Sequence, residues 1–227
     1  MLTLKNLRYQ LFRGLVQTWN LAYDLRFGEI LRGEVKTRFS ELGAEDTANT
    51  SYYALSLFFA GETIAEDDVL VDVGCGKGRV INWWLSKGLR NHIVGLELDP
   101  ELAAHTRHRL RNYPNVTIVS GDGIENLPPD GTLFFLSNPF HRPVVSRFKE
   151  RLLQLTRRDK IRIYYYTCVH ADVFENDPRF SVEKRKPIPE GSSAMLREIL
   201  QRLLQPAAII RLRSSEGYAE PAGVVHL

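Results

Sequence analysis

The sequence predicts an α/β protein with a doubly wound, mostly parallel sheet. Short apolar runs alternate with segments of helical periodicity between residues 67 and 168, a pattern typical of β-α-β units. One run ends in VDVGCGKGRV, residues 71–80, where three glycines stand at alternate positions. Two late apolar segments lack the usual helical crossover, which favours an antiparallel edge on the parallel sheet.

Length and composition limit the number of domains and indicate the cellular compartment. The chain has 227 residues, which suits one α/β domain with a modest extension. Its net charge of +3 permits an anionic partner without requiring one. Only Cys75 and Cys168 are present, so we expect no disulfide framework, no metal site and a reduced, cytoplasmic setting. No apolar run approaches the ~18 residues that span a bilayer, and Lys5, Arg8 and Arg13 interrupt any secretory signal.

Residues 1–60 are predicted to form a helical N-terminal cap, ahead of a core at residues 61–227. Apolar residues recur there at three- and four-residue steps, which places them on one helix face. We expect this face to pack on the domain or on a second copy of the chain. The alternative is a basic amphipathic helix that contacts a membrane surface. The residues of this face are Leu4, Leu7, Leu11, Leu15, Trp19 and Ala22, and Phe12, Val16 and Tyr23 widen it.

The remaining elements follow from apolar runs and helical spacing along the chain. A helical segment is expected at 51–59, and further helices at 80–85, 100–111, 143–155 and 193–204. The expected strands cover residues 69–73, 92–98, 116–120, 132–136, 161–168, 179–187 and 207–213. We expect the tail after Ser214, which contains glycine and proline, to be loosely held.

The glycine-rich turn indicates that something approaches this backbone closely, because glycine is costly in regular structure. The phosphate-loop pattern GxxxxGK[ST] is absent, since Gly78 follows Lys77. The dinucleotide pattern GxGxxG is also absent, since Arg79 stands at its third glycine position. Asp72 precedes the turn. A carboxylate there repels a pyrophosphate and suits an ammonium-bearing ligand.

Acidic residues also follow the next two predicted strands. Glu97 lies nineteen residues after Gly78, and an acidic side chain at that place accepts hydrogen bonds from ribose hydroxyls. Asp122 follows the third strand within Gly-Asp-Gly, and it is suited to accept a hydrogen bond from an adenine amino group. Because ligands of open α/β sheets bind beyond the carboxyl ends of the strands, these side chains predict a nucleoside site.

These stretches resemble the class I S-adenosylmethionine-dependent methyltransferases. VDVGCGKGR is similar to their first motif, GLELDP to their ribose-binding strand and GDG to their adenine-binding turn. The resemblance implies a seven-stranded sheet with an antiparallel last strand pair, S-adenosylmethionine as cofactor and S-adenosylhomocysteine as product. It assigns the amino-acid end of the cofactor to Asp72 with Gly74, Cys75, Gly76 and Gly78. It assigns the ribose to Glu97 with Leu98. It assigns the adenine to Asp122 with Gly123 and Ile124.

The fourth predicted strand ends in Ser-Asn-Pro-Phe, residues 137–140. This is similar to the (Asn/Asp)-Pro-Pro-(Tyr/Phe) motif of methyltransferases that modify amino groups, and to small bacterial relatives with an NPF sequence. The resemblance implies catalytic roles for Asn138, Pro139 and Phe140, with Asn138 near both cofactor and acceptor. The Asn138 side-chain oxygen can accept hydrogen bonds from an amine, and the Phe140 ring can lie against a flat or cationic substrate. One proline instead of two leaves the acceptor open.

The N-terminal cap is expected to shape the acceptor pocket. Residues 24–35 and the pair Tyr52 and Tyr53 resemble the cap of those bacterial relatives. Both tyrosines are candidates to line the pocket, and packing in the core is an equal alternative. His141 is a candidate to take a proton from the acceptor, although methyl transfer to a neutral amine depends mostly on alignment.

Three functions remain open from the sequence. The first is an N-methyltransferase for a protein side chain, such as lysine, or for a small metabolite. The second is a nucleic-acid methyltransferase, which the chain favours less because only two short basic clusters occur, at 157–158 and 184–186. The third is a cofactor-binding subunit without catalysis. A second copy of the chain is a further candidate partner.

Overall fold

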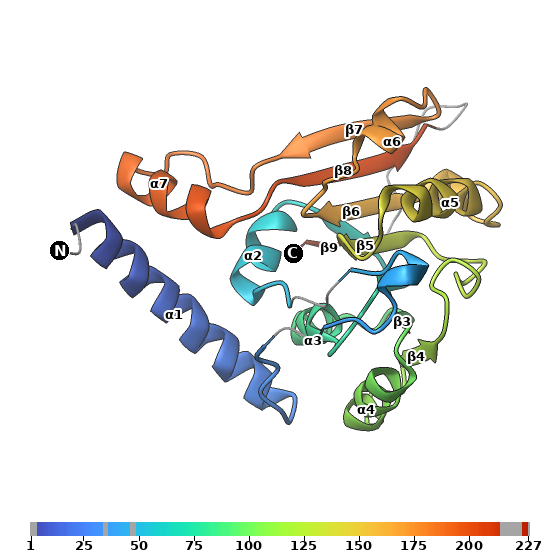
Figure 1. Cartoon of the computed structure of the whole chain (residues 1–227), viewed down its shortest axis with the longest axis horizontal. Coiled ribbons are helices and arrows are strands. Elements are labelled where there is room, and N and C mark those ends of the chain that lie inside the picture. The colour runs from blue at the N-terminus through green and yellow to red at the C-terminus, as the bar shows by residue number, and fades with distance from the viewer. Residues whose placement is uncertain (1–3, 34–35, 46–48, 214–223, 227) are drawn as a thin grey trace.

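A sheet of seven strands forms the centre of the molecule within the described residues (Figure 1). The computed structural model describes residues 4–33, 36–45, 49–213 and 224–226. The strand order is β4-β3-β2-β5-β6-β8-β7, and β8 runs antiparallel to both β6 and β7. The predicted fold class is therefore confirmed. The strands are β2 (Leu70–Val73), β3 (Ile93–Glu97), β4 (Val116–Ser120), β5 (Leu133–Ser137), β6 (Arg162–Tyr166), β7 (Phe180–Arg185) and β8 (Ala207–Leu212).

Helices cover both faces of this sheet, because its strands are apolar on both sides. Strand β2 is buried throughout: Leu70 packs into one core cluster, whereas Val71 packs into the other. Alternate side chains of a strand point to opposite faces, so each strand feeds both clusters. One cluster contains residues of α2 (Tyr52–Phe58), α3 (Arg79–Ser86), α4 (Pro100–Leu110) and α7 (Ala194–Leu203); the other contains residues of α5 (Arg142–Leu152) and α6 (Asp172–Glu175).

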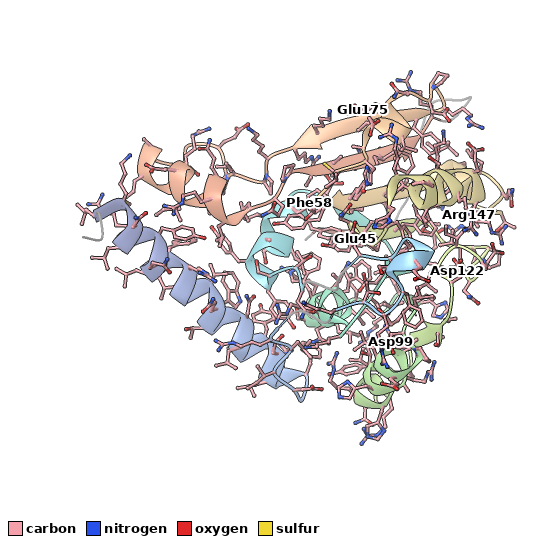
Figure 2. The ribbon with its side chains drawn as sticks, in the orientation of Figure 1. Glu45, Phe58, Asp99, Asp122, Arg147 and Glu175 are labelled. Carbon is pink, nitrogen blue, oxygen red and sulfur yellow. The ribbon has the colours of Figure 1, made fainter. Side chains whose placement is uncertain are left out.

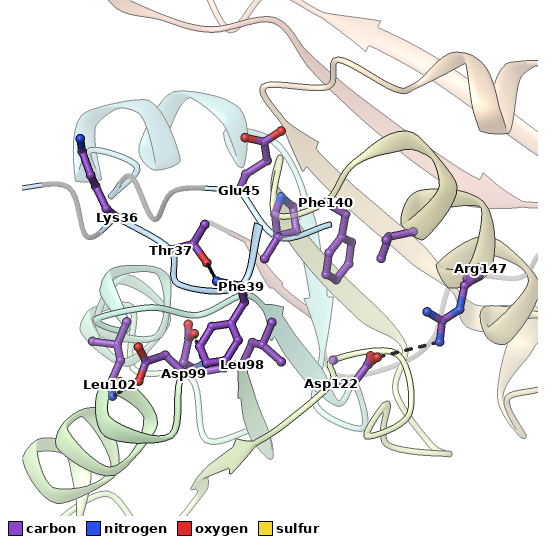
Figure 3. A pocket seen from close by; sticks show the side chains of 16 residues that line it. Lys36, Thr37, Phe39, Glu45, Leu98, Asp99, Leu102, Asp122, Phe140 and Arg147 are labelled. Atoms are coloured by element: carbon purple, nitrogen blue, oxygen red, sulfur yellow. Dashed lines mark hydrogen bonds and ion pairs between the residues drawn. The ribbon is translucent and has the colours of Figure 1, made fainter. Parts of the chain in front are cut away.

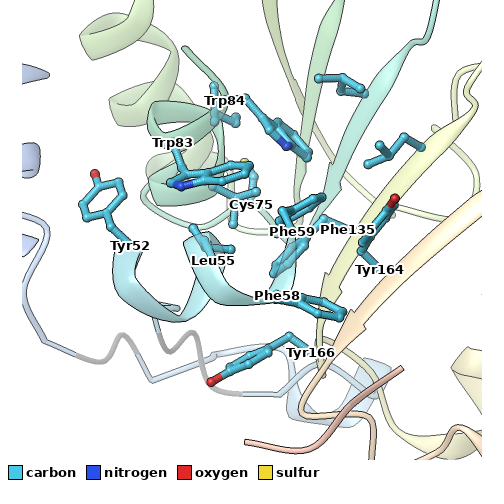
Figure 4. Close-up of a cluster of buried hydrophobic side chains, with 14 of the residues drawn as sticks. Tyr52, Leu55, Phe58, Phe59, Cys75, Trp83, Trp84, Phe135, Tyr164 and Tyr166 are labelled. Carbon is cyan, nitrogen blue, oxygen red and sulfur yellow. The ribbon is translucent and has the colours of Figure 1, made fainter. Parts of the chain in front are cut away.

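Aromatic rings fix helix α2 to the sheet (Figure 4). The Phe59 ring is stacked between two others, with centroids 4.8 Å from Trp83 and 4.5 Å from Tyr164. All three side chains are fully buried or nearly so. Such ring pairs add to the free energy gained by burying the rings. The end of the N-terminal segment is therefore part of the main core.

The N-terminal sixty residues are less helical than predicted. Helix α1 spans Leu4–Arg26, and the chain then runs without helix to α2 except for one 3₁₀ turn at Ser40–Leu42, within the part of the segment that the structure describes. Gly28, with φ 89°, follows the end of α1. A 3.6-residue pattern is absent from residues 27–51, so the helical prediction for that stretch is wrong. The division into a cap at 1–60 and a core at 61–227 remains a prediction.

The predicted apolar face of α1 packs on the molecule along one border only. Leu11 and Leu15 are 62% and 69% exposed. Along the border Val16 is buried, and the rings of Phe12 and Trp19 meet Tyr53 at 5.6 and 5.7 Å between centroids. The predicted packing is therefore confirmed for the border of the face and wrong for its leucines.

A small second sheet was not predicted. Strand β1 (Thr63–Ala65) pairs antiparallel with β9 (Val224–His226). Residues 224–226, near the end of the chain, are therefore hydrogen-bonded to residues 63–65. Most of the tail that we expected to be loosely held, residues 214–223 and 227, lies outside the described residues.

Candidate functional site

A cavity of about 160 Å³ lies at the carboxyl ends of β2, β3, β4 and β5 (Figure 3). Strand β2 has β3 on one side and β5 on the other, so the order of strands reverses there, as at the ligand sites of other open α/β sheets. Glu45, Asp99 and Asp122 gather on this side of the molecule (Figure 2). The cavity is lined by Lys36, Thr37, Phe39, Ala44, Glu45, Gly74, Glu97, Leu98, Asp99, Leu102, Asp122, Gly123, Pro139, Phe140, Val144 and Arg147.

The glycine-rich turn is approached by the protein's own side chains. Gly74, Gly76 and Gly78 all have positive φ, at 74°, 51° and 73°. A Cβ on Gly74 would lie 2.8 Å from the Cβ of Pro139, and one on Gly78 would lie 3.0 Å from the Thr106 methyl. Gly74 therefore lets the Asn-Pro-Phe loop contact the turn while it also lines the cavity. Gly78 begins helix α3.

Asp72 is a buried carboxylate with an unused oxygen. It is 3% exposed, and its Oδ2 atom has no hydrogen-bond partner within the described part of the chain. Burial raises the pKa of Asp72 well above its ordinary value, and the negative charge of Glu97 raises it further. An orphaned buried oxygen is costly. A cationic group placed beside it would satisfy the oxygen and favour the ionised form.

Glu97 presents an ordered carboxylate to the cavity. Its Oε2 accepts a hydrogen bond from the Gly76 amide at 2.8 Å, and its Oε1 accepts one from the Asp99 amide at 2.9 Å. Burial raises the pKa of Glu97, and these two amides lower it in part. Each carboxylate oxygen retains acceptor capacity. Glu97 can therefore accept two further donors with a fixed orientation.

The third strand end supplies Asp122 and Gly123, which both line the cavity. The Oδ1 of Asp122 accepts a hydrogen bond from the Ile124 amide at 2.7 Å, and Arg147 lies 3.9 Å from its Oδ2. Of the other predicted cofactor residues, Leu98 lines the cavity. The side chains of Cys75 and Ile124 are buried in the core clusters instead, so only their backbones are suited to face a ligand.

The Asn-Pro-Phe loop forms a wall of this cavity through Pro139 and Phe140. Asn138 does not line it. Its backbone is left-handed, with φ 46°, and its side-chain Oδ1 accepts a hydrogen bond from the Tyr165 hydroxyl at 3.2 Å. Burial raises the pKa of Tyr165 to about 12, so this hydroxyl stays a donor at neutral pH. The predicted residue Asn138 therefore has an orienting partner that the sequence analysis missed.

A second cavity, of about 280 Å³, borders Ser137, although Asn138 does not line it. It is bounded by the inner side of α1, by residues 49–51, and by Ser137 and Thr167 at the ends of β5 and β6. Pro139 and Phe140 line the first cavity. The Asn-Pro-Phe loop thus stands between two cavities, one rich in carboxylates and one lined mainly by neutral polar groups. The second is lined by Arg13, Val16, Gln17, Asn20, Asn49, Thr50, Ser51, Ser137, Tyr166, Thr167, Leu203 and Gln205.

Residues 36–45, hereafter the roof segment, cover the first cavity (Figure 3). The segment is held to the Asn-Pro-Phe loop by two backbone hydrogen bonds, from Glu45 to the Pro139 carbonyl at 3.2 Å and from His141 to the Gly43 carbonyl at 2.8 Å. It brings Phe39 into the cavity wall, together with Phe140 from the loop. Phe39 stands in a segment without periodicity, so the sequence offered no signal for it. Lys36 was missed for the same reason, whereas Arg147 lies on the predicted helix α5 and was not singled out.

The three predicted acceptor residues are not brought together. Tyr52 is fully buried, and its hydroxyl donates to Asp24 at 2.9 Å. Tyr53 packs edge-on against Phe12. Neither tyrosine lines the first cavity, the second cavity or the groove between α1 and α7, and full burial makes the core alternative the better description of Tyr52. His141 precedes α5 with its Nε2 3.2 Å from a Glu45 oxygen.

A buried ion pair joins the N-terminal segment to the glycine-rich turn. Arg79, directly after Gly78, donates to the two Asp24 oxygens at 3.2 and 2.7 Å. Both side chains are almost completely buried. Asp24 also accepts hydrogen bonds from Leu31 and Tyr52. A buried pair is tolerated when its remaining hydrogen-bonding sites are filled in this way.

Among the described residues no group of three or more His, Cys, Asp or Glu side chains is arranged to hold a metal ion. No described helix is long and apolar enough to cross a membrane.

Part of the chain is similar to known methyltransferases. A family model described as a methyltransferase domain matches residues 70–158. An rRNA adenine N-6-methyltransferase of Lysinibacillus sphaericus is 29% identical over 85 residues, which cover 37% of this chain and 34% of that protein. A protein-L-isoaspartate O-methyltransferase of Ignicoccus hospitalis is 34% identical over 91 residues, which cover 39% of this chain and 43% of that protein. The match therefore spans less than half of either curated relative.

The solved structures support the fold. The crystal structure of an RNA methyltransferase from Salinibacter ruber in complex with S-adenosyl-L-homocysteine superimposes with a TM-score of 0.50 and 17% sequence identity, covering 77% of this chain and 98% of that one. The likeness to small bacterial members with an NPF sequence remains a prediction. Residues 70–158 are therefore similar to a methyltransferase domain, and the described chain has a Rossmann-like methyltransferase fold.

Proposed function

We propose that the chain is an S-adenosylmethionine-dependent methyltransferase that methylates an amino nitrogen of a protein side chain or of a small metabolite. The observation that carries the proposal is the set of carboxylates at three consecutive strand ends, Asp72, Glu97 and Asp122, beside a loop of sequence Asn-Pro-Phe. When bound, the cofactor supplies an electrophilic methyl group on a sulfonium. The product is S-adenosylhomocysteine.

The residues fit this cofactor. The unused Oδ2 of Asp72 suits the ammonium of its amino-acid end. Glu97, whose orientation two amides fix, suits the two ribose hydroxyls. Asp122 suits the adenine amino group, and the Phe39 and Phe140 rings supply apolar wall for the flat base. Each part of the nucleoside thus has a partner of matching chemistry.

Asn138 is proposed to align the acceptor. Its amide oxygen is oriented by Tyr165 and keeps a second lone pair for an N–H of the acceptor amine. Held there, the nitrogen would lie in line with the methyl group that the bound cofactor would supply. The new N–C bond would replace the S–C bond, whose electron pair would stay on sulfur. The amine proton leaves to water, with His141 as a candidate carrier. Alignment of this kind accounts for large rate effects.

A nucleic-acid base is the second candidate acceptor, because two of the similar proteins are named as RNA methyltransferases. An exocyclic amine of a base presents the same N–H groups to Asn138. The two candidate acceptors differ in how their binding depends on salt, since a nucleic acid is bound through phosphate contacts that weaken as salt is raised. Methylation of RNA that weakens as salt is raised would favour the second candidate.

The deciding experiment follows radiolabelled methyl from the cofactor into a cell lysate separated into protein, nucleic-acid, lipid and small-molecule fractions, with Glu97→Ala as the blank. Label in protein or in the small-molecule fraction supports the proposal, and label in RNA or DNA supports the second candidate. Protein that binds the cofactor yet labels nothing would instead be a non-catalytic subunit.

The role of Asn138 is tested on the acceptor so found. Asn138→Ala is expected to lower kcat by about 10- to 100-fold, the usual effect of losing one aligning contact, with little change in affinity for S-adenosylhomocysteine. Tyr165→Phe should give a smaller loss, because the amide stays but loses its orienting donor. Asn112→Ala, at an exposed turn, is the control. Equal losses of turnover and cofactor affinity in Asn138→Ala would show that Asn138 does not contact the acceptor.

A further inference from the structure

Exposed apolar side chains are concentrated on one helix of the described structure. Of nine large apolar side chains that are exposed, six lie on α1. Single exposed leucines are ordinary on a protein surface, whereas a contiguous apolar patch marks a contact with another molecule. The six, hereafter the α1 stripe, are Leu4, Leu7, Leu11, Leu15, Trp19 and Leu25.

The stripe is continuous along the helix. At 100° per residue its members fall within an arc of about 120°, and residues 4–25 span about 32 Å. The opposite side of α1 holds Val16 and Asp24, which are buried against the molecule. Figures 1 and 2 place α1 along one edge of the molecule. The stripe therefore presents a flat, elongated apolar surface.

The surroundings of the stripe are cationic. Helix α1 contains Lys5, Arg8, Arg13 and Arg26 but only one carboxylate, Asp24, which is buried with Arg79. Helical spacing places Arg8 and Arg26 at the border of the stripe, close to Trp19.

A groove beside the first turns of α1 has the same charge. This groove, of about 240 Å³ between α1 and α7, is lined by three cations, Lys5, Arg8 and Arg202, and by one carboxylate, Glu198. Lys5 pairs with Glu198 at 3.1 Å. The groove therefore keeps a positive excess next to the apolar stripe.

We propose that the α1 stripe docks on an anionic lipid surface, with α1 parallel to the membrane plane. Leucines on one side, a tryptophan at the border and basic residues flanking it are the features of helices that lie at the boundary of headgroups and acyl chains. Lipid phosphates complement Arg8, Arg26 and the groove. A second copy of the chain fits less well: two stripes packed together would bring bordering arginines of both copies together without an exposed carboxylate on either α1.

The test is flotation of the full-length chain with vesicles. We expect binding to vesicles of phosphatidylcholine with phosphatidylglycerol, weaker binding to phosphatidylcholine alone, and a loss of the difference at high salt, which screens exposed charges. Arg8→Gln with Arg26→Gln should lower the affinity for the anionic vesicles by about 25-fold, or about fivefold for each cation.

Leu11→Glu with Leu15→Glu places two charges in the stripe and should abolish binding. The variant with both Ala104→Glu and Asn112→Glu adds the same charge at two exposed positions, one within α4 and one in the turn after it, and it should bind as the original chain does. Circular dichroism and affinity for S-adenosylhomocysteine confirm that each variant is folded. Absence of flotation with anionic vesicles overturns the proposal. The proposal is also overturned if sedimentation shows that the original chain is a dimer and that the Leu11→Glu, Leu15→Glu double variant is a monomer. The stripe would then be the contact with a second copy.

Discussion

Asn138 and Thr167 both have a left-handed backbone and stand at equivalent places directly after two neighbouring strands. Ser137 of β5 pairs with Tyr166 of β6, and Asn138 and Thr167 are the next residues along the chain. Their φ angles are 46° and 52°. Asparagine tolerates this conformation, whereas a β-branched threonine does not. Strain of this kind is concentrated at functional sites. Thr167 lines the second cavity, together with Ser137.

Thr167→Gly should raise the free energy of unfolding by about 1 kcal/mol, because relief of roughly 1–3 kcal/mol of strain exceeds the added chain entropy of glycine. Urea denaturation measures the change. Thr117→Gly, at an exposed position of β4 outside the left-handed region, is the control and should be less stable by about 1 kcal/mol. Destabilisation of both variants alike would mean that Thr167 is not strained.

Gly74→Ala should destabilise the protein by about 2–4 kcal/mol, because the new methyl both meets Pro139 and occupies a left-handed position. Gly88→Ala is the matched control: Gly88 has φ 76°, but nothing lies within 4 Å of its Cβ position. It should cost only about 1 kcal/mol. Thermal unfolding of the two variants separates the close contact from the backbone effect. Equal costs would show that Pro139 does not press on the turn.

Asp24→Ala should lower the free energy of unfolding by about 3–5 kcal/mol, since it leaves the buried Arg79 guanidinium without its carboxylate. Asp130→Ala, at an exposed position, should change it by less than about 0.5 kcal/mol. Denaturant unfolding monitored by tryptophan fluorescence gives both values. If Asp24→Ala lowers the free energy of unfolding no more than Asp130→Ala does, the Asp24–Arg79 ion pair is not buried in solution.

Glu97→Ala should weaken binding of S-adenosylhomocysteine by at least about 100-fold, which corresponds to two charged hydrogen bonds of ~1.5 kcal/mol each. Glu66→Ala removes an exposed carboxylate away from the cavity and should leave the affinity unchanged. Calorimetric titration provides the comparison. Unaltered affinity in Glu97→Ala would remove Glu97 from the ribose site.

The ligand-free protein should lose stability as pH rises from mildly acidic values. Burial raises the pKa of Asp72 well above 3.8 and that of Glu97 above 4.5. The folded chain therefore holds protons that the unfolded chain has released above ~pH 4. The free energy of unfolding falls as pH rises through this window, until both carboxyls have ionised in the folded state.

Asp72→Asn should flatten this dependence, and a slope as steep as that of the original chain would rule out Asp72 as its source. Urea unfolding across the window measures the slope. A cationic ligand favours ionised Asp72, so affinity for S-adenosylmethionine should increase with pH over the same range in the original chain and much less in Asp72→Asn.

The sheet was predictable because each strand carries its own signal. The run from Leu70 to Val73 is apolar throughout, and such a run between turn signals indicates a strand that is buried on both faces. The carboxylates Asp72, Glu97 and Asp122 follow from the same reasoning, since parallel strands end at one edge. Local sequence therefore predicted the carboxylates of the proposed cofactor site.

The contributions of distant segments were not predictable. Phe39 reaches the cavity only because backbone bonds join residues 43–45 to the Asn-Pro-Phe loop, and Tyr165 reaches Asn138 only because β5 and β6 are neighbours. Helical periodicity identified a stripe on α1 but not its direction. Asp24 and Val16 decide that direction through contacts with residues far along the chain.

The attachment of the roof segment to the Asn-Pro-Phe loop has a kinetic consequence. The same ten residues cover the nucleoside cavity and hold the loop that positions Asn138. A nucleoside that enters or leaves beneath the roof must displace the segment, and with it the support of Asn138. Under the proposed function we therefore expect cofactor and acceptor to bind in a fixed order, cofactor first, with the spent nucleoside departing last. We then expect the opening of the roof segment, rather than the bond exchange itself, to limit the rate of turnover.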